Sequence, residues 1–436
     1  MSTKSEIKNN VEEEANSCVA VIGIDWADSG HALAVFSDPG SPQAEPELSM
    51  LAQEPGELQQ WAQGLLARWP RGRIAIVIEQ KKGPLINFLY GVERLAIHVV
   101  APQSLAHYRK TFSMANVKAD ASDAVLLGRL FLLHPEAFPA LERAAEEVRL
   151  LDAFCRQRRQ ALRELWVLVL RLRQVLKESY PQAITMLGGV LDNHLACSFL
   201  RRWPSWKALG KVRAQTIRKL FYACHFRSPD ILEKRLKAIE DSVALTGDRA
   251  TIEAAAVQTG HLCARMEPIL RAVEDYDRRI EKLFARQPAA KLFSSFPGAG
   301  KQMAPRLLCA FELHAADLSK AEDIQRLSGV APVQRASGKS LQICRRLARP
   351  IFLHQSFVEF SCWSTRQCCW ANAFYQQQKE RGKSTGSALR VLAFKWQRIL
   401  FRCWKSNTPY DDARYLECLR LNNPVLYAKT LRLATK

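Results

Sequence analysis

Two acidic residues in the first eighty positions each stand where a buried strand is expected to end. An apolar run rich in β-branched residues, 19–24, leads into Asp25, and a second such run, 73–78, leads into Glu79. Both runs are typical of buried strands. If these strands are neighbours, the two carboxylates lie side by side at one edge of a sheet. Asp25 could equally be a surface residue before a turn, but a desolvated carboxylate needs a cation, and a divalent metal is the usual one.

Two further acids, Asp120 and Asp123, precede an apolar helical pattern over residues 125–133. Their spacing of three places them on one face of a helix. The alternative is that Asp120 or Ser122 simply caps the helix. Four close carboxylates repel one another, so an Asp-Glu-Asp-Asp set indicates bound cations. Two Mg²⁺ ions about 4 Å apart would activate an attacking oxygen and stabilise a leaving oxygen at a phosphodiester.

The overall charge favours a nucleic-acid partner. The 436 residues include 63 Lys and Arg against 43 Asp and Glu, a formal net charge of +20, and 48% hydrophobic residues indicate a folded protein. No segment offers the roughly 18 to 20 apolar residues of a membrane span, and no signal peptide is evident, so we expect a cytoplasmic protein without a membrane partner. The 12 cysteines are scattered without a C-x-x-C pair, which favours free thiols over a zinc site.

The elements that would position the acids alternate between strand and helix. After the turn at residues 28–30, residues 31–36 predict an antiparallel strand, with a short third strand near residues 48–51. Helical patterns cover residues 57–69 and 85–95, and residues 96–100 predict another strand. This order predicts a mixed sheet covered by helices.

The middle of the chain predicts two long amphipathic helices, at about residues 150–176 and 249–284, which would pair as a brace or coiled coil within one chain or between chains. Between them, residues 197–239 are basic and aromatic. That segment is either a surface for nucleic-acid backbone and bases or a small helical core with solvated basic flanks.

The last third predicts an α-helical region with two features suited to nucleic acid. Phe296-Pro-Gly-Ala-Gly300 joins two helical patterns and resembles a helix-hairpin-helix turn, although a plain helical connection needs the same glycines. Lys395, Arg398 and Arg402 recur on one face of a helix predicted over residues 387–405. This basic stripe would bind nucleic acid or simply be solvated.

Several segments together resemble one known family, the insertion-sequence 110 family of DEDD transposases. They are Gly23-Ile-Asp25-Trp-Ala-Asp28, Glu79-Gln-Lys-Lys-Gly-Pro-Leu85, Lys118-Ala-Asp120-Ala-Ser-Asp123-Ala124, Phe296-Pro-Gly-Ala-Gly300, Leu327-Ser-Gly-Val-Ala-Pro332, Ser337-Gly-Lys339 and Lys405-Ser-Asn-Thr-Pro-Tyr410-Asp411. The resemblance covers both ends of the chain well and the middle poorly.

Residues 1–17 are polar and rich in acids without periodicity, which predicts a mobile tail. After this tail, the resemblance implies an organisation in three parts. Residues 18–140 would form an RNase H-like (RuvC-like) α/β domain with the acidic site, residues 141–290 a helical or coiled-coil brace, and residues 291–436 an all-α transposase domain with a serine loop. It further implies DNA recombination guided by a structured noncoding RNA, and a homo-oligomer, a dimer or tetramer, that assembles two cutting sites.

Ser337 is the residue that we predict to join the protein covalently to a DNA phosphate. A serine hydroxyl needs a base or a metal to activate it, and no histidine is close in sequence, so the metals of the acidic site are the expected source. Ser340 is a possible substitute. Lys339, Arg345 and Arg346 follow as expected phosphate contacts.

Two alternatives remain open at this point. A RuvC-type junction nuclease would hydrolyse DNA with water and make no use of Ser337. A non-enzymatic nucleic-acid-binding protein would carry the acids incidentally. A covalent DNA adduct that survives denaturation separates the recombinase from both.

Overall fold

The computed structural model describes residues 18–41, 43–112, 120–337 and 340–434, and the side chains of residues 110–122 and 335–341 lie outside that description. The chain forms two compact units, Met1–Arg143 and Ala144–Lys436, which are treated separately below. The finer division expected from the sequence, with limits at residues 17, 140 and 290, stays a prediction.

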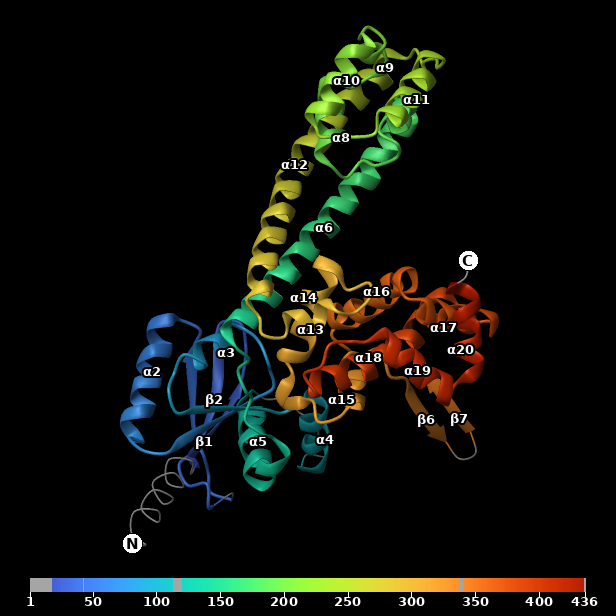
Figure 1. Cartoon of the computed structure of the whole chain (residues 1–436). Coiled ribbons are helices and arrows are strands. Elements are labelled where there is room, and N and C mark those ends of the chain that lie inside the picture. Colours follow the sequence, from blue (N-terminus) through green and yellow to red (C-terminus); the bar gives the residue numbers. More distant parts are fainter. Residues whose placement is uncertain (1–17, 42, 113–119, 338–339, 435–436) are drawn as a thin grey trace. The chain divides into compact units, whose positions relative to one another are not determined.

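A five-stranded mixed sheet forms the centre of the first unit (Figure 1). Its strands are β1 (Cys18–Asp25), β2 (Gly30–Phe36), β3 (Glu47–Ala52), β4 (Arg73–Ile78) and β5 (Leu95–Val99), in the order β3-β2-β1-β4-β5. The β1-β2 and β2-β3 pairs are antiparallel, whereas the β1-β4 and β4-β5 pairs are parallel. The predicted mixed sheet is confirmed, including the short third strand.

Helices cover both faces of this sheet. They are α2 (Pro55–Arg68), α3 (Pro84–Leu89), α4 (Pro102–Phe112) and α5 (Asp120–Leu133). Alternate β1 side chains enter two different cores, because successive residues of a strand point to opposite faces. Ile22 and Ile24 pack with side chains of α2 and α3, and Val21 packs with side chains of α4 and α5. The sequence did not predict α4, and the helix expected over 85–95 is shorter, since α3 ends at Leu89 and β5 begins at Leu95.

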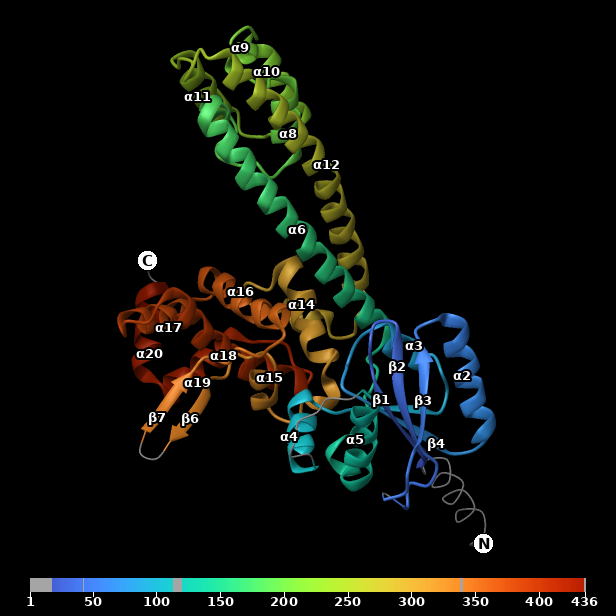
Figure 2. The ribbon, with the colours of Figure 1, turned by 180° about the vertical axis from the view of Figure 1, so that it is seen from behind.

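Two long helices dominate the second unit and run side by side in both views (Figures 1 and 2). They are α6 (Glu146–Ser179) and α12 (Arg249–Ala285), which confirms both predicted long helices. Short helices connect them: α7 (Pro181–Met186), α8 (His194–Arg202), α9 (Trp206–Leu209), α10 (Ala214–Ala223) and α11 (Pro229–Glu240).

The aromatic residues of this connection face inward. Trp203 and Phe221 are buried, and Phe199 contacts both rings edge-on. Tyr222 remains exposed. Of the two readings of this segment, the structure supports the small helical core.

The rest of the second unit is helical, with one hairpin. Its helices are α13 (Ala290–Ser294), α14 (Gly300–Glu312), α15 (Ala321–Leu327), α16 (Ile351–Gln367), α17 (Cys369–Glu380), α18 (Thr385–Lys405), α19 (Asp412–Asn422) and α20 (Pro424–Ala434). Strands β6 (Val333–Ser337) and β7 (Ser340–Cys344) pair in antiparallel register, so the expected all-α region and plain serine loop are corrected to a two-stranded hairpin. The sequence analysis missed these strands although Leu341 and Ile343 alternate with Ser340 and Gln342, and Ile343 is exposed.

The turn between α13 and α14 is buried against α16. A Cβ on Gly298, whose φ is +85°, would lie 2.7 Å from the backbone nitrogen of Ser364. The Gly298 amide donates to Gln367 Oε1 (2.9 Å), and the Ala299 amide donates to the Phe296 carbonyl. These two amides are therefore used inside the fold, as in a plain helical connection, and are not presented to a DNA phosphate.

Candidate active site

Asp25 and Glu79 extend from neighbouring parallel strands of the first unit. In the β1-β4 register Ile24 is paired with Ile78, so the next residue of each strand is an acid. Both acids are half-buried. Because strand residues two apart share a face, Asp25 follows Gly23 on the face covered by α5, and Glu79 follows Val77 on the same face. The structure thus brings these two predicted residues to one sheet edge.

Asp123 approaches the same face through a close contact between backbones. A Cβ added to Gly23 would lie 1.9 Å from the carbonyl oxygen of Ala124, so α5 can lie this near to β1 only because residue 23 is glycine. Ala124 follows Asp123 directly in α5. The contact therefore places Asp123 beside the strand that carries Asp25.

The Asp123 carboxylate is 3% exposed and is held by an arginine from α4. Arg109 donates from Nε to Oδ1 at 3.0 Å and from Nη2 to Oδ2 at 2.5 Å. Such a two-pronged bond both neutralises a buried carboxylate and fixes its plane. Sequence reasoning missed Arg109, because its sequence neighbours give no sign that it pairs with Asp123.

The acidic site has the donor chemistry of a divalent-metal site, although its fourth acid is only partly described. Carboxylate oxygens are the ligands that Mg²⁺ prefers, and Asp25, Glu79 and Asp123 all belong to the sheet face that α5 covers. Asp120 is the first residue of α5, but its side chain lies outside the described residues. Among the side chains that are described, no group of three or more His, Cys, Asp or Glu is arranged to hold a metal. A metal at Asp123 would have to share this carboxylate with Arg109.

A buried histidine fixes the turn that follows Asp25. His31 is fully buried at the start of β2; its Nε2 lies 2.7 Å from Gln53 Oε1, and its Nδ1 accepts the amide of Ala27 at 3.4 Å. These partners place the proton on Nε2. His31 was not singled out from the sequence, since one histidine in a strand carries no signal of its own.

The serine hairpin belongs to the second unit. Its backbone register pairs Ser337 with Ser340 across the turn, so the predicted nucleophile and its substitute are opposite each other. Their side chains are not described, and Lys339 lies outside the described residues altogether.

Three arginines gather beyond this hairpin. Burial, followed by the positive charges of Arg345 and Arg390, lowers the pKa of Arg349, and burial and Arg345 lower the pKa of Arg390. These three side chains, called the arginine cluster below, make no ion pair with any residue that the structure describes. A cluster of uncompensated guanidinium groups favours an anion such as phosphate.

A histidine beside the arginine cluster is affected by the same positive charges. His354 Nδ1 lies 3.1 Å from the Ser328 carbonyl, and burial together with the charge of Arg349 lowers the pKa of His354 to about 4. The expected phosphate contact Arg345 belongs to the cluster, whereas Arg346 contributes its carbonyl oxygen to a bond from Arg349. The sequence analysis did not identify Arg390 as a phosphate contact. Its position on α18, eight residues before Arg398, was the only sequence feature that pointed to this role.

The expected basic stripe on α18 splits into two kinds of residue. Arg398 and Arg402 are exposed. Lys395 lies over the rings of Trp370, Phe374 and Tyr415, with Nζ 4.8 to 5.9 Å from the ring centres, and burial lowers its pKa. Lys395 thus packs onto aromatic rings of its own unit, while the two arginines stay available to a partner.

Comparison with known proteins gives two family matches. Residues 22–181 match the model of DEDD transposases of the IS110 type, described as a transposase. Residues 290–376 match the model described as the transposase family of IS116, IS110 and IS902. The first match contains all four acids, and the second contains the serine hairpin and Arg349.

Individual relatives extend the similarity along nearly the whole chain. A protein of Streptomyces coelicolor, named the mini-circle putative transposase for IS117, is 23% identical over 406 residues, which are 92% of this chain and 97% of the relative. The 43.6 kDa protein of insertion element IS110 from the same organism is 25% identical over 56% of this chain and 59% of its own length. The 42 kDa protein of IS900 from Mycobacterium paratuberculosis is 26% identical over 42% and 48%. Within the described residues, no helix is both long and apolar enough to cross a bilayer.

Proposed function

Since this chain belongs to the IS110 family of transposases, we propose that it cuts and rejoins DNA with the acidic site and Ser337. The observation that supports the acidic half is that Asp25, Glu79 and Asp123 all belong to the face of the mixed sheet that α5 covers. Asp120 completes the proposed set.

The proposed strand cleavage is an exchange of phosphate esters. Ser337 Oγ forms a bond to a DNA phosphorus, the bond from that phosphorus to one deoxyribose oxygen breaks, and the freed oxygen takes up the serine proton. In the rejoining step a strand hydroxyl attacks the phosphoserine and returns the proton to Ser337. One ester is made for each ester broken, so no external energy source is needed.

Protein groups of both units contribute to this exchange. Asp25, Glu79, Asp120 and Asp123 would hold divalent metal, proposed as two Mg²⁺ ions, which supplies charge stabilisation at the phosphodiester. Arg109 fixes the plane of the Asp123 carboxylate, and the arginine cluster together with Arg398 and Arg402 holds phosphates of the DNA.

A structured noncoding RNA and a homo-oligomer complete the proposal. Both are supported by the family resemblance, and the net charge of +20 is compatible with two nucleic-acid partners. Recombination by nuclease-treated protein without added RNA would contradict the RNA part.

The experiment traps the covalent intermediate. Labelled DNA carrying the element ends is incubated with the full chain, any required RNA and Mg²⁺, and is then separated under denaturing conditions. We expect a protein–DNA adduct for the unaltered chain and for Ser340→Ala, and none for Ser337→Ala. An undiminished adduct in Ser337→Ala would remove this residue from the mechanism, and free cut ends without any adduct would favour the water-using nuclease.

A further inference from the structure

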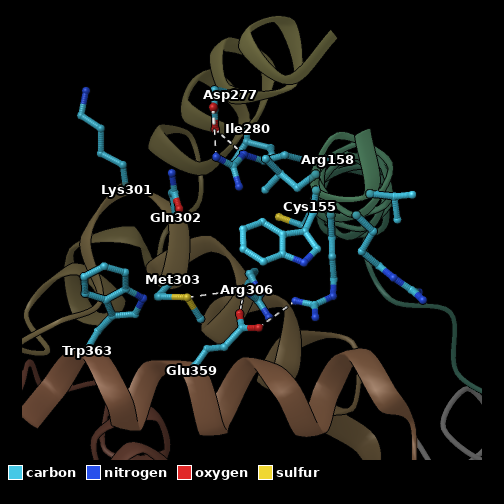
Figure 3. Close-up of a pocket in the computed structure, with 15 residues that line it drawn as sticks. Cys155, Arg158, Asp277, Ile280, Lys301, Gln302, Met303, Arg306, Glu359 and Trp363 are labelled. Atoms are coloured by element: carbon cyan, nitrogen blue, oxygen red, sulfur yellow. Dashed lines mark hydrogen bonds and ion pairs between the residues drawn. The ribbon is translucent and has the colours of Figure 1, made fainter. Parts of the chain in front are cut away.

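A pocket of about 480 Å³ lies in the second unit between α6, α12, α14 and α16 (Figure 3). Its volume is in the range of small-molecule sites. Arg158 and Cys155 enter from α6, Asp277 from α12, Lys301 from α14 and Trp363 from α16. The lining of this pocket shares no residue with the acidic site or with the arginine cluster.

Positive charge exceeds negative charge around the pocket. Its described lining contains five basic side chains, namely Arg158, Arg159, Arg163, Lys301 and Arg306, and two carboxylates, Asp277 and Glu359. Arg158 is paired with Asp277, whereas Arg159 and Arg306 share the single carboxylate of Glu359 at 2.9 and 2.6 Å. Arg163 has no acidic partner among the described residues. Lys301 is paired with Glu281 outside the lining, so the positive charge in excess belongs to Arg163 and to the two arginines that share Glu359.

Arg306 has a buried N–H donor that makes no hydrogen bond within the described part of the chain. Its side chain is 12% exposed; Nε donates to Ser356 Oγ at 3.0 Å, and Nη1 donates to Glu359. Its Nη2 is buried and has no hydrogen-bond partner within the described part of the chain. A buried unpaired donor is costly, so a shift of this side chain toward an acceptor atom of a ligand would be favoured.

Two exposed tryptophans also line the pocket. Trp166 on α6 is 61% exposed and Trp363 on α16 is 47% exposed. The guanidinium of Arg366 lies 4.9 Å from the centre of the Trp363 ring, which holds that ring in place. Large exposed indole rings next to arginine are the arrangement that stacks nucleic-acid bases.

We propose that this pocket binds an unpaired nucleotide of single-stranded nucleic acid, with the base on Trp363 or Trp166 and an acceptor oxygen on Arg306 and Arg163. A base buried in a duplex cannot offer its face to an indole, so the pocket selects single-stranded or flipped-out nucleotides. The inference rests on the nucleic-acid partner of the proposed function but on none of its cleavage chemistry.

The experiment compares the full chain with single variants. Affinities for a labelled oligothymidine and for a duplex of equal length are measured by fluorescence anisotropy. We expect Trp363→Leu and Trp166→Leu to weaken oligothymidine binding by about fivefold or more while duplex binding changes little, and Trp363→Phe to restore it. Tyr222→Leu, which removes an equally exposed ring at α10, is the matched control. For oligothymidine binding, Arg163→Gln should lower the slope of log affinity against log salt by the value of about one phosphate contact. Arg249→Gln, which changes an exposed arginine at the start of α12, should leave this slope unaltered.

Each other outcome has a defined meaning. If both Trp→Leu variants bind oligothymidine as tightly as the unaltered chain, the proposal is overturned although the proposed recombination stands. A change in sedimentation with unchanged binding would assign the surface to a second copy of the chain, which also overturns it. If the unaltered chain binds neither oligonucleotide, the nucleic-acid partner itself fails. A photocrosslink from 5-iodouracil to Trp166 or Trp363 would place the base directly.

Discussion

The acidic site of the first unit and the arginine cluster of the second are built in opposite ways. Backbone geometry places the acids, because the β1-β4 register aligns Asp25 with Glu79 and a glycine contact brings α5 to β1. The arginine cluster forms instead from side chains that meet across distant segments, Arg345 and Arg349 before α16 and Arg390 in α18. Rigid placement suits groups that must hold a transition state, while a group of uncompensated cations suits a ligand held by its phosphates.

The largest effect should come from one acid. Asp25→Asn removes a charge from the proposed metal site, and strand cleavage should fall by about a thousandfold or more, since metal-stabilised charge contributes several kcal/mol to such transition states. Folding and nucleic-acid binding should be retained. The measurement is the single-turnover cleavage rate.

Asp28→Asn is the control for this acid. Asp28 is exposed in the turn that follows Asp25, and its change should leave cleavage near the rate of the unaltered chain. Normal cleavage in Asp25→Asn, or full activity in excess chelator, would show that the acidic site is not catalytic.

A smaller effect should follow from disturbing the backbone contact without touching any acid. Gly23→Ala places a methyl group against the Ala124 carbonyl, so α5 and Asp123 must move away from β1. We expect a loss of about 1–3 kcal/mol in the free energy of unfolding of the first unit, together with a reduced cleavage rate. Denaturant unfolding and the cleavage assay measure the two quantities.

Gly64→Ala is the matched glycine control. Gly64 lies inside α2 with no atom within 4 Å of an added Cβ, so this change should leave cleavage unaltered and stabilise the helix by about 0.5–1 kcal/mol. Equal cleavage by Gly23→Ala and the unaltered chain would mean that the close approach of α5 is irrelevant to the site.

The smallest effect should be seen in the arginine cluster. Arg349→Gln and Arg390→Gln should each lower the slope of log affinity against log salt by about 0.7 to 0.9, the value of one phosphate contact. Cleavage at saturating DNA should change much less than in Asp25→Asn. Arg420→Gln, which removes an exposed arginine already paired with Glu417, should not alter the slope. A thousandfold loss of cleavage in either cluster variant would contradict the proposal that the acidic site and the arginine cluster have different roles.

The same contrast explains what could be predicted from the sequence. Strand ends, long amphipathic helices and the acids at the strand ends follow from local periodicity, so Asp25, Glu79 and the bounds of α6 and α12 were found within a few residues. The roles of Arg109, His31 and Arg390 depend on contacts between segments that are distant in the chain, and no local sequence pattern predicts such contacts. The β6-β7 hairpin was missed because each of its strands has only five residues, and its described side chain Ile343 is exposed.

The interior of the second unit is divided into two apolar cores, and this division bears on how the chain could have evolved. One apolar core uses residues from Val148 to Cys155 together with Ile280 and the later helices, while the other is built only from residues between Leu165 and Leu270. The chain leaves along α6 and returns along α12, so the whole excursion begins and ends at adjacent points of a helical pair. Such a segment can be gained, lost or exchanged between ancestors as one self-contained insertion, without opening the core from which it departs.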